Sequence, residues 1–214
     1  MNVDEGTAKS SANPIFLTGS PFGTVIGTDG PCVAYQDLPT NKLSAGTITV
    51  SGTTSPLTLI PSGTSPAVSY HLDTPSNLFA PGASITIHAT GAEFPMFSAS
   101  VQAPPVLAAF SAATTVSRAA GMTITWTAGT APVVSVSMLG ASASHLTMLL
   151  CRTSDSGSFT LSPSNLALVP ASALSNGTAA LGVARVAQTV VTMPGATATV
   201  GALSQITKRL TVTP

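Results

Sequence analysis

The chain has 214 residues, of which 44% are hydrophobic and only 7% are charged, and its seven basic and seven acidic side chains leave no net charge at pH 7. This composition excludes ordinary intrinsic disorder, which requires low hydrophobicity together with high charge. The balanced charge also excludes the basic surface that nucleic acids or anionic membranes attract, so we expect no nucleic-acid partner. Low charge combined with many Ser and Thr residues is typical of secreted β proteins and of coat proteins.

The sequence also bears on the compartment. No apolar run approaches the roughly eighteen residues of a membrane helix, so we expect no membrane span. Residues 1–6 lack the basic start and the apolar stretch of a signal peptide. Either the chain stays inside the cell, or it is the mature form of an exported protein with an added initiator Met. Composition favours the second interpretation, which predicts an extracellular or cell-surface protein.

The first half of the chain consists of short segments with the pattern of strands. Residues 1–13 show no pattern and are expected to form a flexible leader. After them, aliphatic and hydroxyl side chains alternate in short runs separated by Gly and Pro, which predicts strands with one buried face. These runs lie at residues 15–18, 32–35, 46–51, 57–60, 68–72, 84–89 and 94–101.

Pro104 and Pro105 form the clearest boundary in the chain. Proline cannot donate to a β-ladder and restricts the residue before it, so this pair predicts a stiff connector. The strands on its two sides predict two tandem immunoglobulin-like β-sandwich modules, residues 14–103 and 106–214. A single larger β-sandwich or jelly roll that uses both halves remains the alternative.

The second half carries the strongest strand pattern, from residue 121 to residue 161. Met122, Ile124 and Trp126 alternate with threonines, so the single tryptophan of the chain is expected in a sandwich core. Further strands are expected at residues 132–139, 145–152, 158–161, 179–192 and 203–212. Ser162 and Pro163 have the types of a helix cap and a first-turn residue, and they predict one short helix near residues 163–169.

Cys32 and Cys151 are the only cysteines in the chain. A disulfide between them would connect the two halves and contribute roughly 4–5 kcal/mol on a chain-entropy account. The alternative is a pair of free thiols packed as small hydrophobic side chains, which the apolar surroundings of Cys151 favour.

Candidate catalytic groups are sparse. The sequence has neither a Gly-x-Ser-x-Gly nucleophile elbow nor a phosphate-binding loop. Cys151 lies in an apolar strand and lacks the exposed, electropositive setting of a thiol nucleophile. Of the two glutamates, Glu5 lies in the leader, so Glu93 is not expected to belong to a catalytic carboxylate pair. We therefore predict that the chain is not an enzyme and has no catalytic residue and no cofactor.

Candidate metal ligands are also few. His71 and Asp73 would share a face of a strand, and His88 could join them, but a site needs three or four ligands with supporting contacts. Exposed polar residues explain these positions equally well. Asp155 lies in a Ser-rich turn and offers too few oxygens for calcium, so a hairpin turn is the better interpretation. No metal site is predicted.

Several segments together resemble those of uncharacterised secreted proteins and lipoproteins of myxobacteria-like soil bacteria. The segments that carry the resemblance are residues 43–52, 81–87, 94–104, 122–129, 150–152, 155–161 and 166–170. The resemblance covers roughly residues 43–187 and implies export and a β-sandwich fold, but no reaction. This chain has no lipid-attachment cysteine at its start, so the resemblance does not decide whether it is anchored.

These observations predict a secreted or cell-surface, non-enzymatic β-sandwich protein with a binding, adhesion or structural role. Loops and exposed strand edges would do this work, and the partner would be an unidentified protein or glycan surface ligand. Tyr35 and Tyr70 are the candidates for stacking on a sugar, although half-buried strand positions explain them better. A self-assembling coat or shell subunit is the alternative function, and a hydrolase that uses His71, His88 or His145 is a weaker third.

Overall fold

The computed structural model describes residues 23–37, 42–70, 78–141, 145–169 and 178–213. Within these ranges the chain forms strands β1 to β13 and one short helix, α1, so the predicted all-β class is confirmed. The predicted leader, residues 1–13, lies outside the described residues. No helix in the described ranges is long and apolar enough to cross a membrane.

Most of the predicted strand segments form strands, but β1 and β7 form where none was predicted. The predicted strand at 15–18 lies outside the described residues, and residues 68–70 form only an isolated bridge. The first six strands are β1 (Thr24–Asp29), β2 (Cys32–Gln36), β3 (Ile48–Ser51), β4 (Leu57–Leu59), β5 (Ser84–Ala89) and β6 (Phe97–Gln102). The second group is β7 (Thr115–Ser117), β8 (Met122–Thr125), β9 (Val133–Ala141), β10 (Leu146–Thr153) and β11 (Ser158–Leu161). After α1 (Pro163–Ala167) come the two longest strands, β12 (Thr178–Met193) and β13 (Ala196–Thr213).

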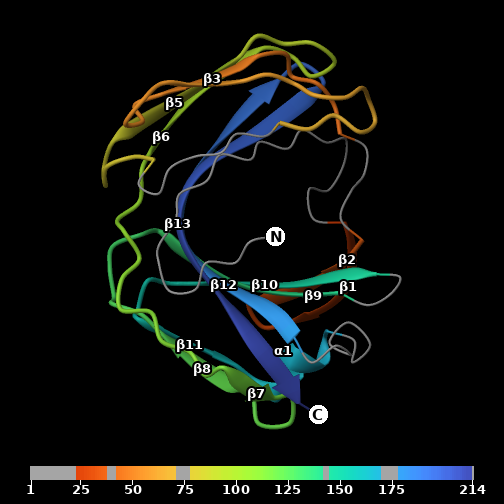
Figure 1. Cartoon of the computed structure of the whole chain (residues 1–214), viewed down its shortest axis with the longest axis vertical. Helices are drawn as coiled ribbons and strands as arrows, with labels where there is room; N and C mark the ends of the chain where they lie inside the picture. The colour runs from red at the N-terminus through yellow and green to blue at the C-terminus, as the bar shows by residue number, and fades with distance from the viewer. Residues whose placement is uncertain (1–22, 38–41, 71–77, 142–144, 170–177, 214) are drawn as a thin grey trace.

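These strands form three sheets. A seven-stranded sheet has the order β1-β2-β10-β9-β12-β13-β7, a four-stranded sheet the order β4-β3-β5-β6, and β11 pairs with β8. All pairings are antiparallel except that of β13 with β7. Figure 1 shows the four-stranded sheet at the top, the seven-stranded sheet across the middle and the β8–β11 pair below it.

The lower core lies between the seven-stranded sheet and the β8–β11 pair. Trp126 is buried in this core, as its position in the alternating pattern predicted. The predicted short helix is also confirmed: the Ser162 side chain accepts a hydrogen bond from the Asn165 backbone, and the Asn165 side chain accepts one from the Ser162 backbone. This reciprocal capping starts α1 at Pro163, and Leu166 on the helix is fully buried in the lower core.

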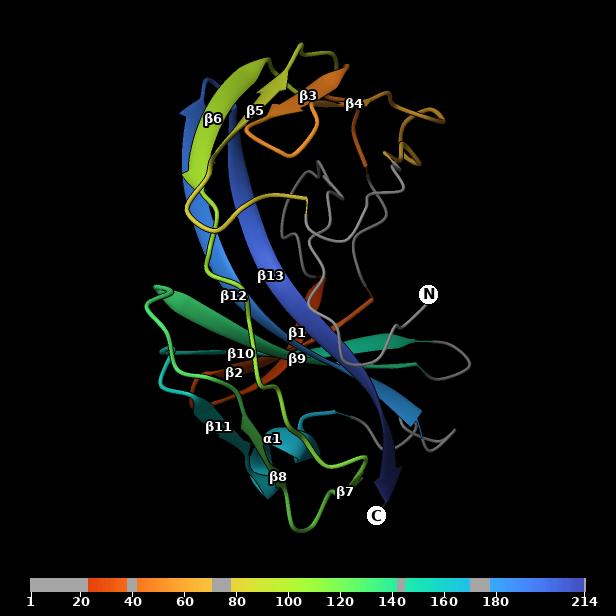
Figure 2. The same cartoon turned by 60° about the vertical axis from the view of Figure 1, so that its left-hand side comes forward.

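The upper core lies between the four-stranded sheet and the far half of the β12–β13 hairpin (Figure 2). The hairpin is long enough to serve both cores. Near its open end β12 pairs with β9, whereas near its turn Ala198, Val200 and Ala202 are buried against the four-stranded sheet. Small and β-branched side chains at alternate positions allow this ribbon to lie close to the sheet that it covers.

The distribution of strands differs from the predicted division into modules 14–103 and 106–214. Strands β1 and β2 precede residue 103 but belong to the seven-stranded sheet of the lower core. The hairpin follows residue 106 but closes the upper core. The physical reason is that a four-stranded sheet has an apolar face that must be covered, and the hairpin covers it. Each core therefore draws strands from both sides of the predicted boundary.

Cys32 on β2 and Cys151 on β10 form a disulfide, so of the two interpretations open from the sequence, the bridge is the one observed. The two residues are directly opposite in the β2–β10 register, and their Cα atoms are 4.0 Å apart. Next to them, Arg152 N donates to Pro31 O. The two cysteines therefore occupy a non-hydrogen-bonded position of the antiparallel ladder, where the Cα atoms of opposite residues lie closest. The free-thiol interpretation was based on the apolar surroundings of Cys151. Cys32 is buried to the same extent, so burial is equally compatible with a disulfide between the two residues.

Candidate functional site

A buried ion pair lies at the junction of the two cores. Arg185, near the middle of β12, contacts Asp155 in the turn between β10 and β11, with Nε to Oδ2 at 2.9 Å and Nη2 to Oδ1 at 3.2 Å. Only 4% of the Arg185 side chain and 2% of the Asp155 side chain are exposed. Trp126 Nε1 donates to Oδ1 at 2.8 Å, and Ala131 N donates to Oδ2 at 3.0 Å. The pair is bidentate and fully surrounded by protein.

The electrostatics of Asp155 follow from these contacts. Burial acts to raise the pKa of this carboxyl group, but the hydrogen bonds from Arg185, Trp126 and Ala131, together with the charge of Arg185, outweigh burial and hold the pKa below its ordinary value. Each carboxylate oxygen already accepts two hydrogen bonds. The acceptor capacity of Asp155 is therefore filled within the protein, which leaves no oxygen lone pair for calcium.

The rest of the Arg185 guanidinium connects two loops. Its Nη1 donates to Val106 O at 2.6 Å, and its Nη2 donates to Thr127 O at 2.5 Å. A Cβ atom at Gly129 would overlap Arg185 Nη2 and Asp155 Oδ2, so a larger residue there would have to displace the ion pair. Arg185 thereby holds the connector after Pro105 and the β8–β9 loop against β12.

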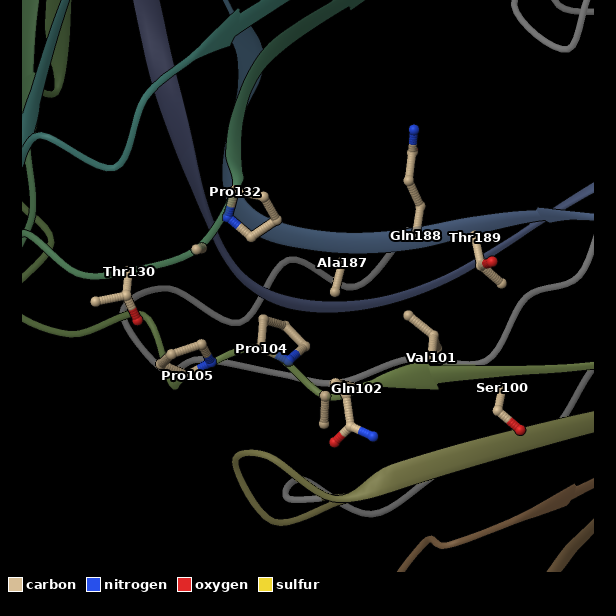
Figure 3. A pocket seen from close by; sticks show the side chains of 12 residues that line it. Ser100, Val101, Gln102, Pro104, Pro105, Thr130, Pro132, Ala187, Gln188 and Thr189 are labelled. Atoms are coloured by element: carbon tan, nitrogen blue, oxygen red, sulfur yellow. The ribbon is translucent and has the colours of Figure 1, made fainter.

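A groove with a volume of about 390 Å³ opens beside this network (Figure 3). Its walls come from three segments, which are the end of β6 with the Ala103–Pro105 connector, the β8–β9 loop at residues 130–132, and β12 at residues 187–189. In Figure 3, Val101 and Ala187 point toward the space between β6 and β12, and Gln188 points away from it. Ala131 belongs both to a groove wall and to the network that fixes Asp155.

The described residues that line the groove carry no charge. The apolar part of the lining consists of small side chains and prolines. The polar lining residues are Ser100, Gln102, Thr130, Gln188 and Thr189. Such a surface has hydrogen-bonding groups and apolar contacts but no charge with which to hold an ionic ligand.

Comparison with known proteins finds no match. No family model, no curated protein and no solved structure matches the chain. The resemblance to secreted proteins and lipoproteins of myxobacteria-like soil bacteria therefore stays a prediction.

The sequence-predicted metal candidates do not come together in the described ranges. His71 and Asp73 lie outside the described residues. His88 is exposed on the outer face of β5. Among the residues that the structure describes, no group of three or more His, Cys, Asp or Glu side chains could hold a metal ion.

The other sequence candidates lie apart from the groove. Cys151 is engaged in the disulfide and is not available as a thiol nucleophile. The Tyr70 hydroxyl donates to Gly46 O at 2.9 Å and accepts from Ala45 N at 2.8 Å, in the upper core. Tyr35 is half-buried on β2, and His145 Nδ1 lies 2.9 Å from an Asp37 carboxylate oxygen at the surface.

The Arg185–Asp155 network and the groove beside it were not predicted from the sequence. A signal for the network was present: Arg185 lies inside an otherwise uncharged, alternating segment that extends from Thr178 to Met193. A charged residue inside a strand with a buried face needs a partner. The groove gave no such signal, because Val101 and Ala187 look like ordinary strand residues.

Proposed function

We propose that this chain is a non-enzymatic binding protein that works outside the cell, secreted or on the cell surface, and that the groove between the two cores takes its ligand. The observation that carries the proposal is the groove itself, a concave site whose walls are held by the Arg185–Asp155 network. Largely preformed concave sites with a few placed polar groups are the usual form of ligand sites.

The chemistry of the lining supports binding and defines the ligand class. None of the described residues that line the groove carries a titratable side chain, so these residues supply no general acid or base. A lining of small apolar residues with hydroxyl and amide residues among them suits an uncharged ligand with its own hydrogen-bonding groups, such as part of a protein or glycan surface. Desolvating a charged ligand there would cost free energy without compensation.

Export is supported by two features. Disulfides persist mainly in oxidising compartments, and the Cys32–Cys151 bridge is buried between strands of the largest sheet. The surface depends on hydroxyl groups for its hydration, since only 7% of the residues are charged.

The proposal is tested by screening the purified chain against arrays of surface glycans and of short peptides. Each ligand found is then measured with Thr130→Trp, which places a large ring at the exposed wall of the groove. We expect at least a tenfold loss of affinity. Thr197→Trp on the exposed face of β13 is the matched control and should bind as the wild type does. Equal binding by both variants, or no ligand in either array, would contradict the proposal.

A coat or shell subunit remains the alternative, and one observation favours it. The outer face of the four-stranded sheet carries exposed, uncharged hydroxyl side chains such as Thr49, Ser98 and Ser100. Faces of this kind allow identical copies to pack without charge repulsion. Light scattering or native mass measurement separates the two functions, because a binding protein gives a monomer or small oligomer and a shell subunit gives a large closed particle.

A further inference from the structure

Among the described residues, strand β6 forms an edge of the four-stranded sheet that lacks the usual protection. In the part of the chain that the structure describes, β6 pairs with β5 alone. The opposite edge strand, β4, has only three residues and lies between Pro56 and Pro61. Its short length and the two prolines prevent a further strand from pairing with it. By contrast β6 has six residues, no charged side chain and no proline. Natural proteins usually protect such an edge or use it for pairing.

The hydrogen-bond pattern shows which β6 residues face the open edge. Ala103 N donates to Ala83 O at 2.8 Å, immediately beyond the β5–β6 ladder. In an antiparallel pair the hydrogen-bonded positions recur every second residue, so Val101 and Ala99 also bond toward β5. On the far side of β5, Thr90 N donates to Thr47 O, which is the phase that this alternation requires.

The intervening residues of β6 therefore direct their backbone groups outward. Ser98, Ser100 and Gln102 present three N–H donors and three C=O acceptors along the open edge. Their side chains are exposed, whereas Phe97, Ala99 and Val101 face the upper core. The donors and acceptors are spaced as an incoming strand would need them.

The groove lies along this same edge. Ser100, Val101 and Gln102 line it, and β12 at Ala187 forms its other side (Figure 3). A strand added to β6 would direct alternate side chains into the space between Val101 and Ala187. Its remaining side chains would continue the exposed hydroxyl face of the sheet.

We infer that β6 binds an extended, uncharged peptide segment by strand addition, with small apolar side chains of the segment in the groove. Backbone hydrogen bonds to Ser98, Ser100 and Gln102 supply affinity, and the neutral groove supplies selectivity. Pro104 ends the pairing edge because proline has no N–H group. The inference rests on the proposed binding function and names the class of its ligand.

Amide hydrogen exchange on the full, ¹⁵N-labelled chain tests the inference directly. The probes are capped seven-residue peptides in which Thr alternates with Ala, Val or Ser. In the free chain, the amides of Ser98, Ser100 and Gln102 should exchange fast while that of Val101 exchanges slowly. A saturating peptide should slow exchange at the three edge amides at least tenfold and leave Val101 unchanged.

Two comparisons separate backbone recognition from side-chain recognition. Ser100→Ala keeps the edge N–H and should bind the peptide within about twofold of the wild type. Ser100→Pro removes that N–H, which proline can do at an open edge without breaking the ladder to β5, and should bind at least tenfold more weakly. A peptide N-methylated at alternate residues should lose binding to the wild type, a measurement that does not depend on how a variant folds.

Three results would overturn the inference. If the peptides leave the edge amides unprotected while array glycans still bind in the groove, strand addition is wrong and the proposed function stands. If neither peptides nor glycans bind, both fail. If the edge amides are protected in the free chain in proportion to protein concentration, a second copy of the chain occupies the edge, which favours the shell alternative.

Discussion

At the scale of single residues, the most consequential group is the carboxylate of Asp155. A charged pair placed inside a protein loses its hydration, and the loss is compensated only when every donor and acceptor is satisfied. Trp126 and Ala131, at the two ends of the β8–β9 loop, and Arg185 on β12 satisfy Asp155. The network therefore joins the β8–β9 loop to β12 through one side chain.

Asp155→Asn should lower the free energy of unfolding by about 3–5 kcal/mol, because the buried guanidinium of Arg185 loses its counter-charge. Urea unfolding at pH 7, followed by Trp126 fluorescence and circular dichroism, measures the loss. Asp37→Asn is the matched control, since Asp37 is exposed and contacts only a surface histidine among the ion pairs described. Its cost should stay below about 1 kcal/mol. Equal losses of unfolding free energy in both variants would show that the buried ion pair contributes no more to stability than the exposed one.

The stability contributed by Asp155 should depend on pH in a defined direction. The folded state lowers the pKa of this carboxyl group below its unfolded value of roughly 3.9. Its contribution is therefore complete at pH values above the unfolded pKa and is lost as the pH falls through the folded pKa. The difference in unfolding free energy between wild type and Asp155→Asn should be constant from neutral pH to about pH 5 and shrink below about pH 4. A difference that grows in acid would contradict this account.

At the scale of elements, the disulfide binds β2 to β10 across a sequence separation of 119 residues. Without it, the unfolded chain would gain the freedom of a large loop. The bridge thus holds β1 and β2 on the far edge of a sheet whose other strands come from the second half of the chain.

Cys32→Ala combined with Cys151→Ala should lower the free energy of unfolding by roughly 4–5 kcal/mol on the chain-entropy account. Urea unfolding with and without dithiothreitol provides the control: the reductant should lower the wild-type midpoint toward that of the double variant and leave the double variant unchanged. Thiols that react with maleimide in the unfolded, unreduced wild type would show that the bridge is absent.

At the scale of the whole molecule, the β12–β13 hairpin makes the two cores dependent on each other. Its strands pair along the full length of β12, from Thr178–Thr211 to Met193–Ala196, and contribute buried residues to both cores. Loss of the upper core would expose the apolar face of half the hairpin. We therefore expect the cores to unfold together.

Ile48→Ala tests this coupling, because Ile48 is fully buried in the upper core and Trp126 reports on the lower one. The variant should lower the free energy of unfolding by about 2–5 kcal/mol, as read from Trp126 fluorescence. Thr49→Ala, the exposed neighbour on the same strand, should leave the transition in place. An unchanged Trp126 transition in Ile48→Ala would indicate that the upper core is an independent module.

Local patterns predicted much of the secondary structure. The alternation at Met122, Ile124 and Trp126 depends on neighbours two residues apart, and the start of α1 depends on Ser162, Pro163 and Asn165 within one turn. Interactions of this range depend only on residues that are close in the sequence. The strands, their buried faces and the start of the helix could therefore be inferred from short segments.

The arrangement of these elements could not be inferred in the same way. A period of two identifies the buried face of a strand but not the sheet that covers it. The position of the hairpin over the four-stranded sheet could therefore not be predicted from the sequence. The same holds for the pairing of Asp155 with Arg185, 30 positions away, and for the groove that Val101 and Ala187 share. Contacts between distant segments arise from the packing of whole sheets, so they cannot be predicted from the sequence of any single segment.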